Sequence, residues 1–212
     1  MNAMNGMNAN RPLRQFSLAC AGAALAATTW ACGLNEAGLS LDARLWREEA
    51  VANDVASGDE GWYRLAVHGD AIDVRLARPE CGDEDVPAGT MYVQLPDATI
   101  LEGTRVNHLF PQGAFHPRVG DAYRLALGRT EVEFHVESSG RGTEYVIRYG
   151  GIDHRYVLGR PASATRLHAV ADLDGDRLPD FLVEVGGVTF LLLSSHARAG
   201  TNFPSAQLWA AG

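Results

Sequence analysis

Four aspartates crowd into nine residues near the C-terminal end of the chain, at Asp172, Asp174, Asp176 and Asp180. They occupy positions 1, 3, 5 and 9 of the segment, the spacing with which a loop wraps carboxylate oxygens around a hard cation. Leu178 stands at position 7, where its backbone carbonyl would add a ligand. Carboxylates packed this closely repel one another at neutral pH, and a divalent cation turns that repulsion into binding energy. The segment therefore predicts a metal site.

The chemistry of the ligands indicates which cation. Oxygen-only ligands favour Ca²⁺ over zinc, and magnesium prefers a smaller octahedral site that retains several waters. Gly175 relaxes the backbone where the loop must turn tightly. The alternative is an acidic, solvated turn between two strands, but the alternating spacing with apolar runs on both sides favours a Ca²⁺ loop.

The segment from Asp172 to Asp180, followed by Phe181-Leu182-Val183, resembles the calcium loop of FG-GAP, integrin-type repeats, over about the last fifth of the chain. It differs from an EF-hand, because position 12 is Val183 rather than glutamate and a β-run follows. FG-GAP repeats usually occur in series that build a propeller, whereas this chain has a single copy. Arg177 stands where glycine is frequent, so we expect its backbone to avoid positive φ.

Other chemistries lack a local motif. All 18 basic side chains are arginine, which excludes a Schiff-base lysine and a P-loop lysine. Ser194-Ser195-His196 is a poor nucleophile motif, because neighbouring residues of a strand point to opposite faces. The sequence thus favours a calcium-binding, non-catalytic binding module, and the alternative is a small calcium-dependent extracytoplasmic hydrolase.

The N-terminal residues predict export. Arg11 and Arg14 precede an apolar, alanine-rich run over 16–30 that ends at Ala31, as in a secretory signal peptide. We expect residues 1–31 to be removed and residues 32–212 to form a single all-β calcium-binding domain in the periplasm or outside the cell. The formal net charge of −8 disfavours nucleic acid and anionic membranes as partners.

Two of the three cysteines remain once the leader is removed, Cys32 and Cys81. An oxidising compartment favours a disulfide between them, which would contribute roughly 4 kcal/mol in the chain-entropy model. The alternative is lipidation of Cys32 as in a bacterial lipoprotein, which would anchor the protein to a membrane. Thr29 and Trp30 fit a lipidation motif poorly, although Gly33 is compatible with one.

The rest of the chain predicts an antiparallel β domain, a sandwich or partly closed barrel with one strand–calcium loop–strand unit. A short amphipathic helix is expected between Ser40 and Ala56, where Leu41, Leu45 and Val51 stand among charges. Alternating and β-branched runs separated by Gly, Asp and Pro predict the strands. They are Trp62–Val67, Ile72–Leu76, Met91–Leu95, Tyr123–Leu127, Val132–Val136, Tyr145–Arg148, Tyr156–Leu158, Phe181–Val185 and Val188–Leu193.

The tail from Val188 to Ser195 gives the chain a looser similarity to periplasmic immunity proteins and type I lysozyme inhibitors. That similarity implies an inhibitor whose partner is a peptidoglycan-degrading enzyme. Exposed hairpin tips often carry such contacts, so the tip that contains Ser139 and Arg141 is the first candidate surface. Arg141 would offer a bidentate contact to a carboxylate of the enzyme. The loop from His108 to Pro117 is the second candidate.

Overall fold

The computed structural model describes residues 38–42, 45, 46, 48, 61–77, 86, 87, 89–95, 100–109 and 114–208. Residue contacts divide the chain into Met1–Leu34 and Asn35–Gly212, and all described residues belong to the second unit. The predicted leader, with its boundary after Ala31, therefore lies outside the described residues, as do Cys32 and Cys81. Within the described part, no helix is long and apolar enough to cross a membrane.

Besides the helical residues Leu45, Trp46 and Glu48, which lie between the first two strands, fourteen strands and one 3₁₀ turn have described bounds. They are β1 (Gly38–Asp42), β2 (Trp62–His68), β3 (Ala71–Ala77), β4 (Met91–Gln94), β5 (Gly103–Val106), β6 (Ala122–Leu127), β7 (Thr130–Ser139), β8 (Gly142–Tyr149), β9 (Ile152–Leu158), β10 (Thr165–Ala171), β11 (Asp180–Val185), β12 (Val188–Leu192), η3 (Ser194–His196), β13 (Gly200–Asn202) and β14 (Ala206–Leu208).

The strands form two hydrogen-bonded sheets, neither of which closes into a barrel among the described residues. One has the order β10-β11-β12-β14-β1-β4-β2-β3-β5, and the other has the order β13-β9-β8-β7-β6. Neighbours are antiparallel except β1 with β14 and β13 with β9, which run parallel. The predicted mainly β fold is confirmed as a sandwich, and each predicted strand overlaps an observed one.

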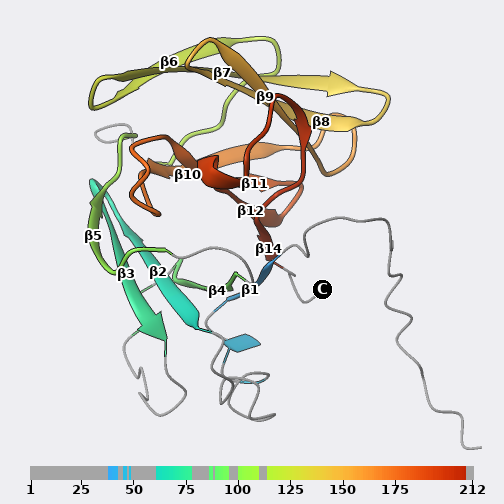
Figure 1. Ribbon diagram of the computed structural model, residues 1–212. Helices are drawn as coiled ribbons and strands as arrows, with labels where there is room; N and C mark the ends of the chain where they lie inside the picture. The colour runs from blue at the N-terminus through green and yellow to red at the C-terminus, as the bar shows by residue number, and fades with distance from the viewer. Residues whose placement is uncertain are drawn as a thin grey trace, which may run out of the picture. The chain divides into compact units, whose positions relative to one another are not determined.

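The nine-stranded sheet contributes to two layers: β10–β12 form a middle layer, and β2–β5 form an outer one. The middle layer is covered on both sides, because consecutive side chains of β11 enter different cores. Phe181 and Val183 pack with the five-stranded sheet, whereas Leu182 packs with residues of β2, β3 and β4 such as Leu65 and Val74. Figure 1 shows β6 to β9 on one side of β10–β12 and β2 to β5 on the other. A strand buried on both faces reads as a continuous apolar run rather than an alternating one. That explains the near-continuous apolar sequences of β11 and β12.

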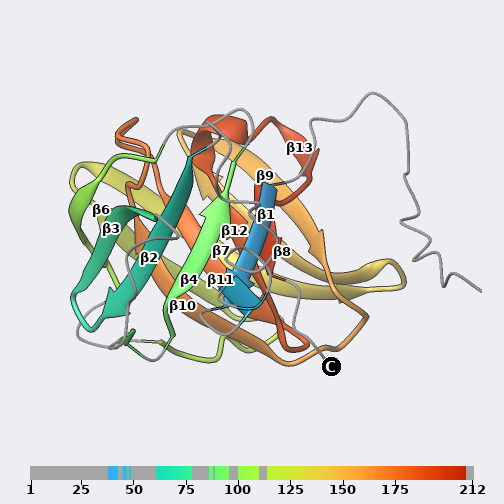
Figure 2. The same ribbon diagram turned by 90° about the horizontal axis from the view of Figure 1, so that it is seen from below.

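The N-terminal part of the unit joins the two halves of the nine-stranded sheet. β1 lies between β14 and β4, and Figure 2 shows it beside β4. Trp46 stacks on Tyr92, with ring centroids 4.5 Å apart, and packs edge-on against Trp62. The helix expected between Ser40 and Ala56 was wrong at its start, because Ser40, Leu41 and Asp42 lie in β1 and pair with β4. Most of the rest of that segment lies outside the described residues.

The shared middle layer predicts that both cores unfold together. Phe181→Ala should lower the free energy of unfolding by about 3–5 kcal/mol and Leu182→Ala by about 2–5 kcal/mol, because each opens a cavity in a different core. Differential scanning calorimetry should show one transition that moves to lower temperature in both variants. Leu76→Ala, at a leucine that is 45% exposed, is the control and should change stability by less than about 0.5 kcal/mol. Two separate transitions, only one of which moves, would contradict the shared layer.

Candidate metal centre

The acidic loop connects two neighbouring strands of the middle layer. β10 ends at Ala171 and β11 begins at Asp180, and these two residues pair directly across the ladder. Leu173 is 2% exposed and anchors the loop in the core shared with β2–β4. Its carbonyl accepts a hydrogen bond from the Leu101 N–H at 2.8 Å. The loop is therefore held at both ends and by a buried side chain within it.

Three of the predicted ligands converge. Asp172, Asp174 and Asp176 each offer one carboxylate oxygen, and these oxygens all lie within 4.8 Å of one another, so the cluster could hold a metal ion. Backbone N–H groups of the loop fix their orientation. The Gly175 N–H donates to Asp172 Oδ1 at 2.7 Å, and the Leu178 N–H donates to Asp176 Oδ1 at 2.7 Å. The predicted contribution of the Leu178 carbonyl stays a prediction.

Asp180 has a different place from the other three aspartates. It is 1% exposed, and its Oδ2 accepts from the Leu173 N–H at 2.7 Å, while its Oδ1 accepts from the Ser194 N–H at 2.8 Å. Burial, together with the nearby carboxylate of Asp174, raises the pKa of Asp180 to about 8. Asp180 thus fastens the loop to the chain after β12, and direct ligation by its carboxylate stays a prediction.

Ser194 links Asp180 to the three-carboxylate cluster. Its hydroxyl oxygen lies 2.9 Å from Asp176 Oδ2 and 2.9 Å from Asp180 Oδ1. A hydroxyl has one proton to donate, so it cannot satisfy both ionised carboxylates at once. Burial also raises the pKa of Asp176. The arrangement leaves negative charge that either a proton or a cation must compensate.

Asp174 supplies an oxygen that fits a cation ligand. Its Oδ2 is buried and has no hydrogen-bond partner among the described residues. A buried oxygen without a partner carries a desolvation cost of about 1–3 kcal/mol, which metal coordination would remove. Burial also raises the pKa of the Tyr149 hydroxyl above its usual range, and the negative charges of Asp176 and Asp180 add to this effect. The carboxylate oxygens of the loop therefore fit the ligand preference of a hard cation.

The backbone of the loop corrects one expectation. Arg177 has φ of 66°, so the prediction that it avoids positive φ was wrong. A non-glycine residue in this region is normally held there by its surroundings. Here the Arg177 N–H donates to Asp172 Oδ2 at 3.1 Å, and the carboxylate thereby selects the left-handed conformation. Gly175 has φ of 86°, in the left-handed region that glycine adopts without strain, and a Cβ there would also meet the Leu101 side chain.

The predicted partner-contact residues lie at the tip of the β7–β8 hairpin. Arg141 is 67% exposed, and its Nη2 lies 3.3 Å from Oε1 of Glu144, whose side chain is only 3% exposed. The Ser139 hydroxyl donates to the same Glu144 oxygen at 2.6 Å. Both residues therefore stabilise a buried carboxylate within the hairpin, a role that the sequence did not indicate. Contact with a partner stays a prediction.

The loop from His108 to Pro117, the second candidate surface, is described only in part, because residues 110–113 lie outside the described residues. Its two ends pack along β10. The His108 N–H donates to the Val170 carbonyl, and Phe115 pairs with Leu167. These contacts cover the free edge of β10, which gives the described ends of the loop a structural role.

Comparison of the chain with models of protein families, with curated proteins and with solved structures found no match. The assignment of the loop therefore depends on its own geometry.

Ser194, which belongs to a poor nucleophile motif, has a structural role in this centre, and the contribution of its hydroxyl to stability can be tested. Ser194→Ala should destabilise the metal-free protein by about 1.5–3 kcal/mol, because it removes a buried hydroxyl that donates to charged groups. Urea unfolding in the presence of chelator measures the loss. Ser195→Ala is the matched control, since Ser195 is exposed and should tolerate the change. Equal stability of the two variants would show that the Ser194 hydroxyl contributes nothing to the loop.

Proposed function

We propose that this chain is an exported, calcium-binding, non-catalytic binding module that acts as an inhibitor or immunity protein against a cell-wall lytic enzyme. The observation that carries the metal part is the convergence of one carboxylate oxygen each from Asp172, Asp174 and Asp176. The buried Asp174 Oδ2, which has no hydrogen-bond partner among the described residues, supports it. Ca²⁺ accepts six to eight oxygen ligands in flexible geometry, so water and the Leu178 carbonyl would complete the shell. Zinc would instead require nitrogen or sulfur ligands in most sites.

The charge balance of the loop supports calcium in a second way. A divalent ion beside Asp176 would relieve the competition between Asp176 and Asp180 for the single Ser194 proton. It would also favour the ionised form of Asp180, whose pKa is raised without it. Because Asp180 and Ser194 anchor the loop to the chain after β12, calcium in this position stabilises the folded state by linkage.

The inhibitory role follows from the similarity of the Val188–Ser195 tail to lysozyme inhibitors and from two surface properties. The formal net charge of −8 favours fast association with a positively charged partner. The β7–β8 tip presents Arg141 on a hairpin whose strands pair through seven residue positions. A rigid hairpin holds a contact residue with little loss of conformational entropy, which is what a tight inhibitor needs.

Calcium binding is the first part of this proposal to be tested. Titration calorimetry should detect one Ca²⁺ per chain with a dissociation constant between about micromolar and millimolar. At a calcium concentration 100 times that constant, linkage adds about 2.7 kcal/mol to the free energy of unfolding. For a unit of this size that raises the melting temperature by roughly 5–11 °C relative to the protein in chelator.

Asp174→Asn is the diagnostic variant, because it removes the negative charge of the carboxylate whose Oδ2 has no hydrogen-bond partner among the described residues. It should weaken Ca²⁺ binding at least tenfold, or about 1.4 kcal/mol. Asp121→Asn is the matched control, since Asp121 is exposed beside β6 and should leave affinity unchanged. If the melting temperature is the same in chelator and in about 5 mM Ca²⁺, and the titration gives no heat, the calcium assignment is wrong.

The inhibited partner is the second part of this proposal to be tested. Capture of proteins from an envelope extract with the purified protein should retain a peptidoglycan-degrading enzyme, and the protein should inhibit it. Arg141→Ala should weaken inhibition by about 2 kcal/mol or more, as loss of a buried charged anchor does. Arg129→Ala removes the arginine of the β6–β7 turn, at the opposite end of β7, and is the matched control.

Arg141 also contacts Glu144, so the melting temperature of each variant must be measured beside its inhibition. A folded Arg141→Ala variant that inhibits as well as the parent protein would move the contact surface to the loop from His108 to Pro117. Lytic activity of the purified protein on peptidoglycan would support the alternative of a small calcium-dependent hydrolase and reject a non-catalytic role.

A further inference from the structure

The outer edge of the five-stranded sheet is an open β-strand. β6 pairs with β7 along one side, and no residue of the described chain pairs with its other side. It is six residues long, contains no proline, and has Arg124 as its one charged side chain. Exposed edges of this kind are templates for pairing with another strand unless charge, proline or a bulge protects them.

The turn that follows β6 determines which backbone groups face outward. Leu127 pairs with Thr130 across the two-residue turn of Gly128 and Arg129, where Gly128 has φ of 60°. In such a hairpin the flanking pair exchanges hydrogen bonds, and pairs alternate along the ladder. Leu125 therefore bonds to β7, whereas the N–H and C=O groups of Arg124 and Ala126 point away from the sheet.

The inner face of β6 lies over an open apolar groove. Tyr123 and Leu125 are half-buried and pack against the core between the five-stranded sheet and β10–β12. Beside them a groove of about 500 Å³ is lined by Leu109, Phe115 and Phe134. A strand added at this edge would place its own inward side chains over the groove, so apolar residues in alternate positions are required of the occupant.

We propose that the occupant is a second copy of this chain, paired antiparallel through β6 about a twofold axis at Leu125. The two five-stranded sheets then join into one continuous sheet. Arg124 faces Ala126 of the second copy and exchanges the outward backbone hydrogen bonds with it, while the two Leu125 side chains meet over the groove. This register keeps every inward residue on the inner face, which antiparallel pairing requires. The proposed dimer is independent of the metal centre.

Charge selects this register over its nearest rival. An axis at Arg124 overlaps the strands equally well, but it places two Arg124 side chains directly opposite each other, which is destabilising. With the axis at Leu125, each Arg124 meets the small side chain of Ala126 instead. Ala126 in turn pairs with Glu131 on β7, so Glu131 of one copy lies one strand beyond the alanine that Arg124 of the other copy faces.

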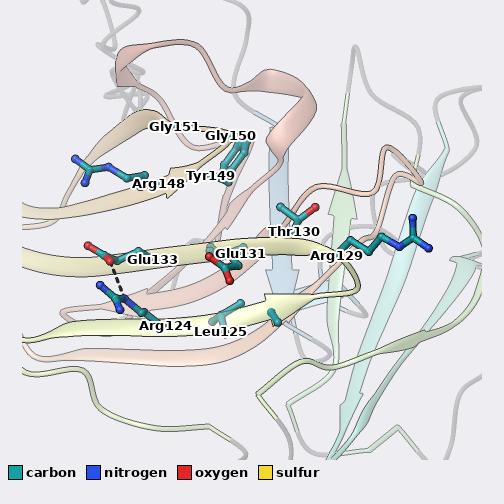
Figure 3. Close-up of a pocket in the computed structure, with 12 residues that line it drawn as sticks. Arg124, Leu125, Arg129, Thr130, Glu131, Glu133, Arg148, Tyr149, Gly150 and Gly151 are labelled. Carbon is teal, nitrogen blue, oxygen red and sulfur yellow. Dashed lines mark hydrogen bonds and ion pairs between the residues drawn. The ribbon is translucent and has the colours of Figure 1, made fainter.

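The outer face of β6 and β7 is hollowed beside this edge. A pocket of about 1030 Å³ opens there. Figure 3 shows Arg124, Glu131 and Glu133 among the residues that line it. Arg124 Nε donates to Glu133 Oε2 at 3.0 Å, as the dashed line marks. Glu131 is exposed and has no ion-pair partner among the described residues. A second copy adds the positive charge of its Arg124 to the wider surroundings of Glu131, while each Arg124 keeps its ion pair with Glu133 of its own copy.

The test uses the short distance at the twofold axis. Paired residues that do not exchange hydrogen bonds have Cα atoms about 4.5 Å apart, within the range that a disulfide spans. Leu125→Cys should therefore give a disulfide-linked dimer under mild oxidation, seen on a non-reducing gel. Tyr123→Cys is the matched control, because its two copies lie four residues out of register, about 13 Å apart.

We expect at least about fivefold more linked dimer from Leu125→Cys than from Tyr123→Cys, with the unsubstituted chain and its own cysteines as the baseline. Sedimentation velocity on the full, unsubstituted protein should show a concentration-dependent monomer–dimer equilibrium in the micromolar range, since a strand pair buries less surface than a stable interface. Equal linking of the two variants would overturn the register, and a monomer at every concentration up to about 500 µM would overturn the dimer.

Ala126→Arg provides a second variant at an exposed position that should not disturb folding. It places an arginine opposite Arg124 of the second copy at two symmetric positions. Association should weaken by about twofold to thirtyfold, because like charges directly opposite in a sheet repel. The thermal melt of the monomer should be unchanged within about 2 °C. A folded Ala126→Arg variant that dimerises as well as the parent protein would also reject the proposed pairing.

Discussion

Burial of both faces of β10, β11 and β12 is the constraint on which the rest of the structure depends. Every residue of β11 except Glu184 is buried, and alternate side chains enter separate cores. Strands in this position cannot carry polar side chains on either face without a partner. The polar groups of the middle layer therefore lie near its ends and in the connections, or are paired, as His168 of β10 is with Glu184 of β11. The longest of these connections is the acidic loop.

A loop fixed at the end of a doubly buried layer can hold charges close together, because the cost of their repulsion is met by packing elsewhere. Asp180 illustrates the point. It occupies the first position of β11, where the apolar layer ends, and its buried carboxylate is stabilised by two backbone N–H groups and one hydroxyl. The same anchoring leaves Asp174 with an oxygen that no donor of the described residues reaches. Rigidity and incomplete satisfaction together are what a cation site requires.

The sequence predicted the β class and the position of the aspartates because both depend on short-range patterns. Alternation along a strand and spacing within a nine-residue loop are local properties. It did not predict the division of the nine-stranded sheet into two layers, since continuous apolar runs do not say what covers each face. Short strands such as β5 and β13 were also missed, because three or four mixed residues carry no period.

Contacts between distant parts of the chain explain what was missed at the site. Ser194 lies 14 residues beyond Asp180, and no spacing rule connects a serine after β12 with a loop before β11. The backbone preference of Arg177 alone predicts a negative φ, but the Asp172 carboxylate accepts its N–H, and this hydrogen bond outweighs that preference.

Asp172, whose carboxylate selects the strained conformation of Arg177, is also a proposed metal ligand. A cation that binds Asp172 would thus compete with the hydrogen bond that holds Arg177, unless each of the two interactions uses a different lone pair of the carboxylate. Carboxylate oxygens offer about four such sites, so both can coexist. The loop can therefore keep its conformation when a cation binds, and the bound cation would add stability without refolding it.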